Sequence, residues 1–229
     1  MSDETAPDPV PEAIAADDGP QEPRVWITKG SPWTIDAARR ERWSAPEAVA
    51  EHAVDIRQVG DPVLHAPAKK PRMDRRELEV LAQRMFASML VAHGVGIAAQ
   101  QIGVPLRVVI IDVDEVGIVA VNPEIDWGSP EVEETSEGCL SVRGMYGMLE
   151  RPQVARLSAL DITGKRFVIE GEDMGAQCML HETDHTNGML YTDRLRTRTD
   201  LFTVEPDDPD EEHRSLSGHS RAEMERTTS

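Results

Sequence analysis

The residues best suited to chemistry lie in the segment from His181 to His185, which reads H-E-T-D-H and has the form H-E-x-x-H. On an α-helix, residues four apart differ by about 40° around the axis, so both imidazoles can bind one metal ion. Glu182 lies beside that face, where its carboxylate can take a proton from an activated water and return it to a leaving nitrogen. Taken alone, the pattern favours a metal hydrolase only modestly over a charged helix face that carries two histidines by chance.

The chain has two cysteines, and either could supply a third protein ligand for the metal. Structural zinc sites usually draw on C-x-x-C pairs, and this sequence has none. A catalytic site needs only three protein ligands, so the two histidines and one thiolate would suffice. We interpret Cys178 as a small buried apolar side chain, but not Cys139, which stands in the glycine-punctuated stretch E-G-C-L-S. Two cysteines without a secretory context also favour a reducing, cytoplasmic compartment.

A glycine-rich stretch from Gly94 to Gly103 completes the set and reads G-V-G-I-A-A-Q-Q-I-G. Glycines at positions 94 and 96 permit unusual backbone angles and the close approach of another chain. The stretch is not a dinucleotide-binding fingerprint, because that pattern needs a glycine at the position of Ala99. An ordinary helix end, with Gly94 as the residue that stops the preceding helix, explains Gly94 but not the whole run.

Together these stretches resemble the peptide deformylase family. Its three motifs occur in the expected order as Gly94 to Gln101, Glu137 to Ser141 and His181 to His185, and the resemblance covers roughly residues 54–203. It implies an α+β fold with short antiparallel β-sheets around a central metal-binding helix. The implied function is that of a metal-dependent hydrolase that removes the N-formyl group from the N-terminal formyl-methionine of nascent polypeptides and releases formate.

The resemblance also implies the metal site and its base. Cys139, His181 and His185 would bind one divalent metal, with water as the fourth ligand. The family typically uses Fe(II) and accepts nickel, cobalt or zinc, and this donor set fits such borderline metals without selecting among them. Glu182 would serve first as the general base and then as the general acid.

Other roles implied by the resemblance concern the substrate. The oxyanion would be held by the side-chain amide of Gln101 and the backbone N–H of Leu140. The peptide would lie along the Gly94–Gly96 edge as an added strand, and its methionine would enter an apolar pocket. The residues expected to contact the substrate are Val95, Gly96, Gly138, Met174 and Cys178. The chain departs from the family pattern at Arg143, Gln177, Leu180 and Thr186, which leaves the catalytic groups in place and affects side-chain preference.

Two further pairings are expected around the motifs. Arg151 is predicted to pair with Glu137, since the family often links its motif glutamate to an arginine. Asp184 is interpreted either as an acceptor that orients a ligand imidazole or as a solvent-facing acid, with about equal weight.

The length and composition of the 229 residues predict one domain with an acidic tail at each end. The first 22 residues carry seven acids and no base, and residues 205–229 carry eight acids and three arginines. We expect a disordered N-terminal tail at 1–23, a tryptophan-containing extension at 24–53, the catalytic domain at 54–203 and a disordered C-terminal tail at 204–229. The folded domain shows no basic patch in its sequence, so we do not expect it to bind nucleic acid directly. No apolar run is long enough to span a membrane.

The spacing of apolar residues and turn signals places the main elements. A helix is predicted from Asp74 to Ala92, with Asp74 as N-cap and Gly94 ending it. The other predicted elements are a short helix at Pro46–His52, strands at Arg107–Val113 and Gly117–Asn122 (the second stopped by Pro123), a hairpin of Val154–Leu160 with Arg166–Glu170, and the metal helix at Asp173–Thr186.

Two rival interpretations remain. A zincin-type metallopeptidase shares H-E-x-x-H, but its extended pattern needs a histidine where Tyr191 stands. A non-catalytic binder of nascent chains or ribosomes, derived from a decayed enzyme, should have lost one of the motif residues, and all are present. Formyl-methionyl nascent peptides are therefore the expected partners, with at most a transient encounter with the ribosome, since residues 205–229 are acidic where some deformylases carry a basic docking helix.

Overall fold

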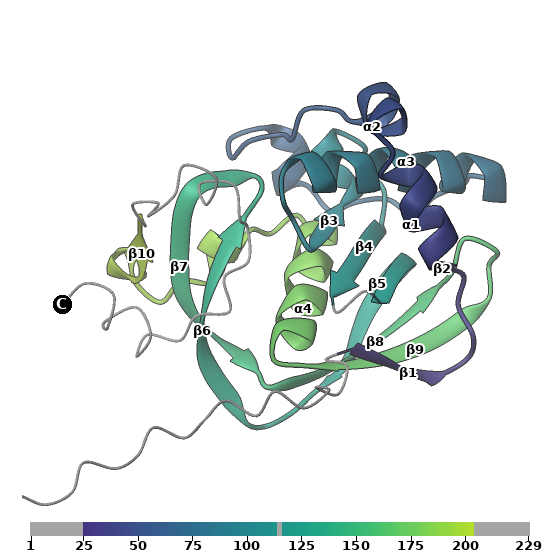
Figure 1. Ribbon diagram of the computed structural model, residues 1–229. Coiled ribbons are helices and arrows are strands. Elements are labelled where there is room, and N and C mark those ends of the chain that lie inside the picture. The colour runs from purple at the N-terminus through teal and green to yellow at the C-terminus, as the bar shows by residue number, and fades with distance from the viewer. Residues whose placement is uncertain (1–24, 114–115, 204–229) are drawn as a thin grey trace, which may run out of the picture.

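One helix, α4 (Met174–Thr186), lies between two antiparallel β-sheets (Figure 1). The computed structural model describes residues 25–113 and 116–203, so the predicted tails at 1–23 and 204–229 lie outside the described residues. Within the described part, no helix is both long and apolar enough to cross a membrane. The arrangement matches the α+β fold expected from the sequence.

The larger sheet has seven strands in the order β1-β9-β8-β5-β4-β3, with β2 pairing on β5, and the smaller has the order β10-β7-β6. The edge strand β3 of the larger sheet is followed directly by the short 3-10 helix η2. The strands of the larger sheet are β1 (Val25–Lys29), β2 (Thr34–Ile35), β3 (Gly96–Ala98), β4 (Val108–Val113), β5 (Val116–Gly128), β8 (Val154–Leu160) and β9 (Arg166–Glu172). The smaller sheet contains β6 (Val132–Cys139), β7 (Val142–Pro152) and β10 (Leu201–Phe202). The other helices are α1 (Ala37–Trp43), α2 (Pro46–His52), α3 (Arg75–Val91), η1 (Pro62–His65), η2 (Ala99–Ile102), η3 (Tyr191–Arg194) and η4 (Arg198–Asp200).

Strand β4, next to the edge strand β3, is buried on both faces, which explains its nearly continuous apolar sequence V-V-I-I-D-V. Val108 and Ile110 belong to the apolar cluster that contains α3. Val109 and Ile111 belong to the second cluster, which contains the apolar residues of α4. The strand therefore separates two cores, and α4 is fixed against one of them.

Helix α3 begins as predicted and ends differently. Asp74 caps its first turn, and Glu77 completes a capping box by accepting from the Asp74 N–H at 2.7 Å. The expectation that Gly94 stops the helix is wrong, because the left-handed residue after it is His93, with φ of 54°. Gly94 instead lies in a tight space, since a Cβ there would lie 3.0 Å from Leu140 Cδ1 and 3.2 Å from Met89 Cγ.

Strand β5 also departs from the prediction that Pro123 would stop it. The strand continues to Gly128, and its register with β8 shifts between Val121 and Glu124. Proline lacks an N–H and is tolerated at such an irregularity, where the regular pairing is interrupted. The predicted helix at Pro46–His52, the hairpin of β8 and β9 and the metal helix are confirmed within one or two residues.

The stretch from Val25 to His52 packs on the rest of the protein at several points. Strand β1 pairs with β9, and the short strand β2 pairs with β5. Trp43 is buried against Phe86 of α3, with ring centroids 5.9 Å apart. The backbone N–H of Trp33 donates to Asp161 at the tip of the β8–β9 hairpin, at 2.9 Å.

Asp161 should contribute to stability in a pH-dependent way. Burial alone would raise the pKa of its carboxyl, but hydrogen bonds from Thr163, Trp33 and Lys165 outweigh burial and lower that pKa. The stabilisation is therefore present above the ordinary pKa of about 3.9 and is lost as pH falls through the lower value in the folded protein. We expect Asp161→Asn to reduce the free energy of unfolding by about 1–3 kcal/mol at neutral pH, measured by urea titration.

The difference between wild type and Asp161→Asn should shrink as the pH is lowered below about 3.9, where the wild-type carboxyl is also protonated. Asp126→Asn, which alters an exposed carboxylate of β5, is the control and should change stability by no more than about 0.5 kcal/mol. If the difference between wild type and Asp161→Asn stayed constant down to a pH of about 2, the charge of the carboxylate would not be the source of the stabilisation.

Candidate active site

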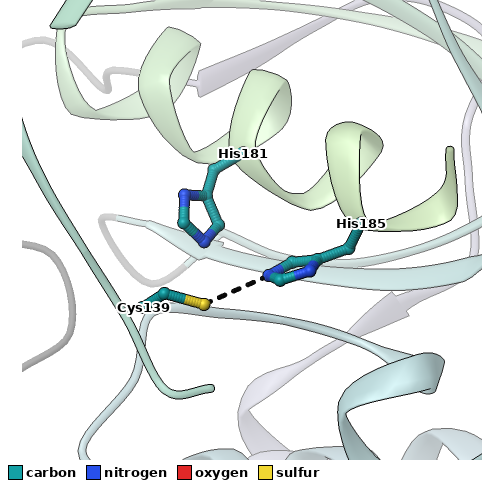
Figure 2. A group of neighbouring side chains, drawn as sticks. All are labelled: Cys139, His181 and His185. Carbon is teal, nitrogen blue, oxygen red and sulfur yellow. Dashed lines mark hydrogen bonds between the residues drawn. The ribbon is translucent and has the colours of Figure 1, made fainter. Parts of the chain in front are cut away.

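Three potential metal ligands converge in the interior of the protein. The ligand atoms of Cys139, His181 and His185 all lie within 4.8 Å of one another, and the three residues are buried. Figure 2 shows both imidazoles extending from one face of α4 toward the thiol, with Cys139 Sγ 3.3 Å from His185 Nε2. Two histidines four residues apart therefore share a face, as the spacing predicts.

Cys139 occupies an irregular position at the end of β6. The register between β6 and β7 shifts between Gly138 and Cys139, just before the chain turns into β7. The backbone N–H of Ser141 donates to Cys139 Sγ at 3.4 Å, and the side-chain amide of Gln101 donates at 3.6 Å. Donors aimed at the sulfur stabilise a thiolate, the form of cysteine that binds metals.

The two histidines are held in different electrostatic environments. His181 Nδ1 bonds to Glu137 Oε2 at 2.8 Å, which leaves Nε2 to face the thiol. Burial opposes a charge on His181, but the Cys139 thiolate and Glu137 outweigh it and raise the His181 pKa well above its usual value. Burial, followed by the charge on His181, holds the pKa of His185 well below its usual value. A neutral His185 is the form that can act as a ligand.

A chain of buried ion pairs supports this arrangement. Arg151 of β7 donates to both oxygens of Glu137, at 2.6 and 3.0 Å, and also to Asp184 of α4, at 2.9 Å. Asp184 pairs in addition with Arg194. Burial would raise the pKa of Glu137, but the hydrogen bond from His181 and the charge of Arg151 lower it to about 2. The predicted Glu137–Arg151 pair is thus confirmed.

Both interpretations of Asp184 are wrong. The acid that orients a candidate ligand imidazole is Glu137, which comes from a different element than the helix. Asp184 is buried rather than solvent-facing, and its oxygens are taken by Arg151 and Arg194. The pairing with Arg194 was not predicted, and the chain that follows the helix brings this arginine to α4.

Glu182 lies beside the three candidate ligands on α4 and is almost fully buried. Burial is the main reason that its pKa is raised to about 8, with the charge of Glu137 adding to the effect and that of His181 opposing it. Its Oε2 atom has no hydrogen-bond partner among the described residues. Gly96 of β3 packs directly against it, since a Cβ at Gly96 would lie 2.6 Å from Glu182 Oε1 and 2.7 Å from Cys178 Sγ.

Gln101 and Leu140 flank Cys139 from two sides. The Gln101 carbonyl oxygen accepts from the Ala98 N–H at 2.8 Å, which turns its amide nitrogen toward Cys139 and toward Ser141 Oγ at 3.3 Å. The carbonyl of Leu140 accepts from Gln58 Nε2 at 3.1 Å. Sequence reasoning missed Gln58, because a glutamine far from the motifs carries no chemical signature of its own.

The expected substrate contacts fall into two places. Val95, Met174 and Cys178 lie in one apolar cluster between α4 and the larger sheet, and Cys178 is fully buried as predicted. Burial is the main reason that the pKa of the Cys178 thiol is raised. Gly138 instead lines a cavity of about 310 Å³ together with Cys139 and Leu140. The other residues lining this cavity are Ala53 to Ile56, Ser88, Val91, Ala92 and Val142 to Tyr146.

A family model described as polypeptide deformylase matches residues 53–200. The chain belongs to this family. Its members are metal-dependent hydrolases that remove N-formyl groups from nascent peptides. The zincin alternative fails on the structure, since the Tyr191 hydroxyl donates to the Met145 carbonyl at 2.9 Å and the third candidate ligand is a cysteine.

Individual relatives agree with the family model. The chain is 42% identical over 140 residues to peptide deformylase 1 of Clostridium acetobutylicum, covering 61% of this chain and 93% of that protein. It is 39% identical over 174 residues to peptide deformylase 1 of Streptomyces avermitilis, covering 72% and 81%. Among solved structures, peptide deformylase from Thermotoga maritima is similar with a TM-score of 0.61 and 35% identity, covering 64% of this chain and 99% of that one.

The buried ion pairs predict a large and specific loss of stability. Arg151→Met should leave Glu137 and Asp184 as buried carboxylates with less compensation, and we expect it to lower the free energy of unfolding by about 3–5 kcal/mol. Arg196→Met is the matched control, because Arg196 is 53% exposed and pairs with Glu134 and Glu150 on the surface. Its loss should cost at most about 1 kcal/mol. Urea denaturation of both variants beside wild type measures the difference, and equal losses would rule out a special role for the buried chain.

Proposed function

We propose that Cys139, His181 and His185 hold one divalent metal, Fe(II) in the cell, in a deformylase that acts on N-formylmethionyl nascent peptides. The observation that carries this proposal is the convergence of the three buried ligand atoms within 4.8 Å, beside the carboxylate of Glu182. A thiolate and two imidazoles form a donor set that also accepts nickel, cobalt or zinc. The carboxylate on His181 Nδ1 supports the same role, because metal-binding histidines usually donate their second nitrogen to such a group.

When bound, a divalent metal supplies a Lewis acid that lowers the pKa of water and polarises a carbonyl. Glu182 then acts as the proton carrier. It takes a proton from the attacking water and delivers it to the methionine nitrogen as the C–N bond of the formamide breaks, so that formate and a free amino terminus leave. Its Oε2 has no hydrogen-bond partner among the described residues, which supports this role because that oxygen can bond with the reactants.

Gln101 and Leu140 would stabilise the oxygen of the formyl group as negative charge develops on it. The amide nitrogen of Gln101 is already turned toward Cys139 by the bond between its carbonyl oxygen and the Ala98 N–H. The Leu140 N–H belongs to the residue that directly follows Cys139. Donors fixed in advance at such a position are worth roughly 3–4 kcal/mol each in the transition state.

The substrate backbone would add to the edge of β3, the last strand in the order of the larger sheet, which pairs with no further strand among the described residues. Gln101, whose amide nitrogen lies 3.6 Å from Cys139 Sγ, follows the C-terminal end of β3. The C-terminal end of β3 is therefore the end nearer to Cys139. A peptide whose formyl group is at Cys139 would therefore run from Ala98 toward Gly94, antiparallel to β3, with Gly138 across from it. Its methionine side chain would enter the apolar cluster of Val95, Met174 and Cys178.

We assign residues 54–203 to the catalytic domain and residues 24–53 to an extension of it. We also place the reaction in the cytoplasm, where thiols stay reduced, because both cysteines are unpaired. The encounter with the ribosome that supplies the nascent peptide would be transient.

The assignment is tested by formate release from formyl-Met-Ala-Ser with protein purified anaerobically and loaded with iron or nickel. Glu182→Ala should retain the metal and lose turnover by about 10²–10⁴-fold, because the proton carrier is removed while the ligands remain. Cys139→Ala should lose the metal. Cys178→Ala is the matched control for metal content, since it removes the other buried thiol of the protein.

Metal content per chain and the rate of formate release separate the outcomes. Near-normal turnover by Glu182→Ala would show that another group carries the proton. Equal metal retention by Cys139→Ala and Cys178→Ala would show that the thiolate is not a ligand. No release by folded, metal-loaded wild type would overturn the assigned reaction.

A further inference from the structure

An ion pair joins the extension to the strand next to the proposed substrate edge. Arg40 of α1 donates to both carboxylate oxygens of Asp112 on β4, with Nη1 2.7 Å from Oδ2 and Nη2 bonded to Oδ1. The Asp112 side chain is only 9% exposed and that of Arg40 is 30% exposed. Arg40 precedes the region matched by the family model, which begins at residue 53. The pair is thus a contact between the extension and the catalytic domain.

Asp112 in turn holds the backbone at the start of β3. Its N–H donates to the Val95 carbonyl at 2.8 Å, and β4 continues the pairing with Gly96 opposite Ile111. Cys178 Sγ lies 3.6 Å from the same carbonyl. The residue that Arg40 binds therefore fixes the peptide group that leads into Gly96, which packs against Glu182.

The chain makes room for this pair at Gly117, the partner of Asp112 on β5. A Cβ at Gly117 would lie 3.1 Å from Arg40 Nη2 and 3.2 Å from Asp112 Oδ1, and it would come within 2.9 Å of Ile35 Cβ. A Cβ at position 117 would require Ile35 to shift and would crowd both the guanidinium and the carboxylate. The glycine allows the arginine to reach over β5 to β4.

We propose that Arg40 is a positioning residue for substrate binding, acting through Asp112 on the Val95–Gly96 segment that receives the peptide backbone. The inference rests on the proposed function and adds a role for the extension in it. Arg40 is not itself one of the candidate ligands, the base or an oxyanion donor. Its effect should therefore fall on peptide affinity and spare the chemical step.

The physical reason lies in the partly buried carboxylate. Without Arg40, Asp112 loses a bidentate, charge-assisted partner. Its carboxylate is then a poorly compensated charge, and the side chain moves toward solvent. Movement of Asp112 weakens its hydrogen bond to Val95 and loosens the first residues of β3. A peptide that adds to this edge then has a less ordered backbone to pair with, in the ground state and the transition state alike.

The experiment measures kcat and KM for formyl-Met-Ala-Ser in metal-loaded Arg40→Ala, at equal metal content and below the melting temperature of every variant. We expect KM to rise about three- to tenfold, comparable to the loss of one hydrogen bond, with kcat within about twofold of wild type. Arg40→Lys keeps the charge without the bidentate geometry and should give an intermediate KM.

Two controls separate positioning from simple stabilisation. Arg39→Ala removes the neighbouring arginine, which pairs with Asp36 and stacks on Trp33 but is not bonded to Asp112, and should leave KM unchanged. Asp161→Asn releases Trp33 and destabilises the extension elsewhere, so it should lower the melting temperature without raising KM.

Either of two results would overturn the inference while leaving the proposed function intact. One is an unchanged KM in Arg40→Ala when wild type releases formate. The other is an equal rise in KM in Asp161→Asn, which would reduce Arg40 to a structural role. A wild-type protein that releases no formate would instead refute the proposed function on which the inference depends.

Discussion

The buried carboxylate of Glu137 is the constraint on which the rest of the structure depends. It accepts hydrogen bonds from His181 on α4 and from Arg151 on β7, and it is itself part of β6. One charged group thereby ties α4 to two strands that are already hydrogen-bonded to each other. A buried charge with this many partners tolerates little displacement, because every lost hydrogen bond leaves part of the charge uncompensated.

This constraint explains how a thiol and two imidazoles meet although Cys139 and His185 are 46 residues apart in the sequence. The helix supplies the spacing of the histidines, whereas the distance between helix and strand is set by the Glu137, Arg151 and Asp184 pairs. On the opposite side of α4, Gly96 lets β3 approach Glu182 more closely than any side chain would permit. The site is therefore held from both sheets at once.

The local parts of this arrangement could be predicted from the sequence. Helical spacing placed His181 and His185 on one face, and the motifs singled out Cys139 and Gln101. The partners of buried charges could not be predicted, because they depend on which strand lies across from the helix. The assignment of Asp184 failed for this reason, and Gln58, Arg194 and the pair between Arg40 and Asp112 were missed. Pro123 failed as a stop signal because an irregular pairing with β8 accommodates it.

The two ends of the larger sheet are not equivalent, and β1 is the reason. It covers one side of β9, and its pairing shifts between Ile27 and Lys29, the second of which is exposed. A short strand with an irregular register and a lysine discourages further strand pairing, a common protection against edge-to-edge aggregation. The far end of the sheet, at β3, has no such protection within the described residues. Indiscriminate pairing is thus discouraged at one border, and the proposed substrate strand would add at the other, where β3 pairs with no further strand among the described residues.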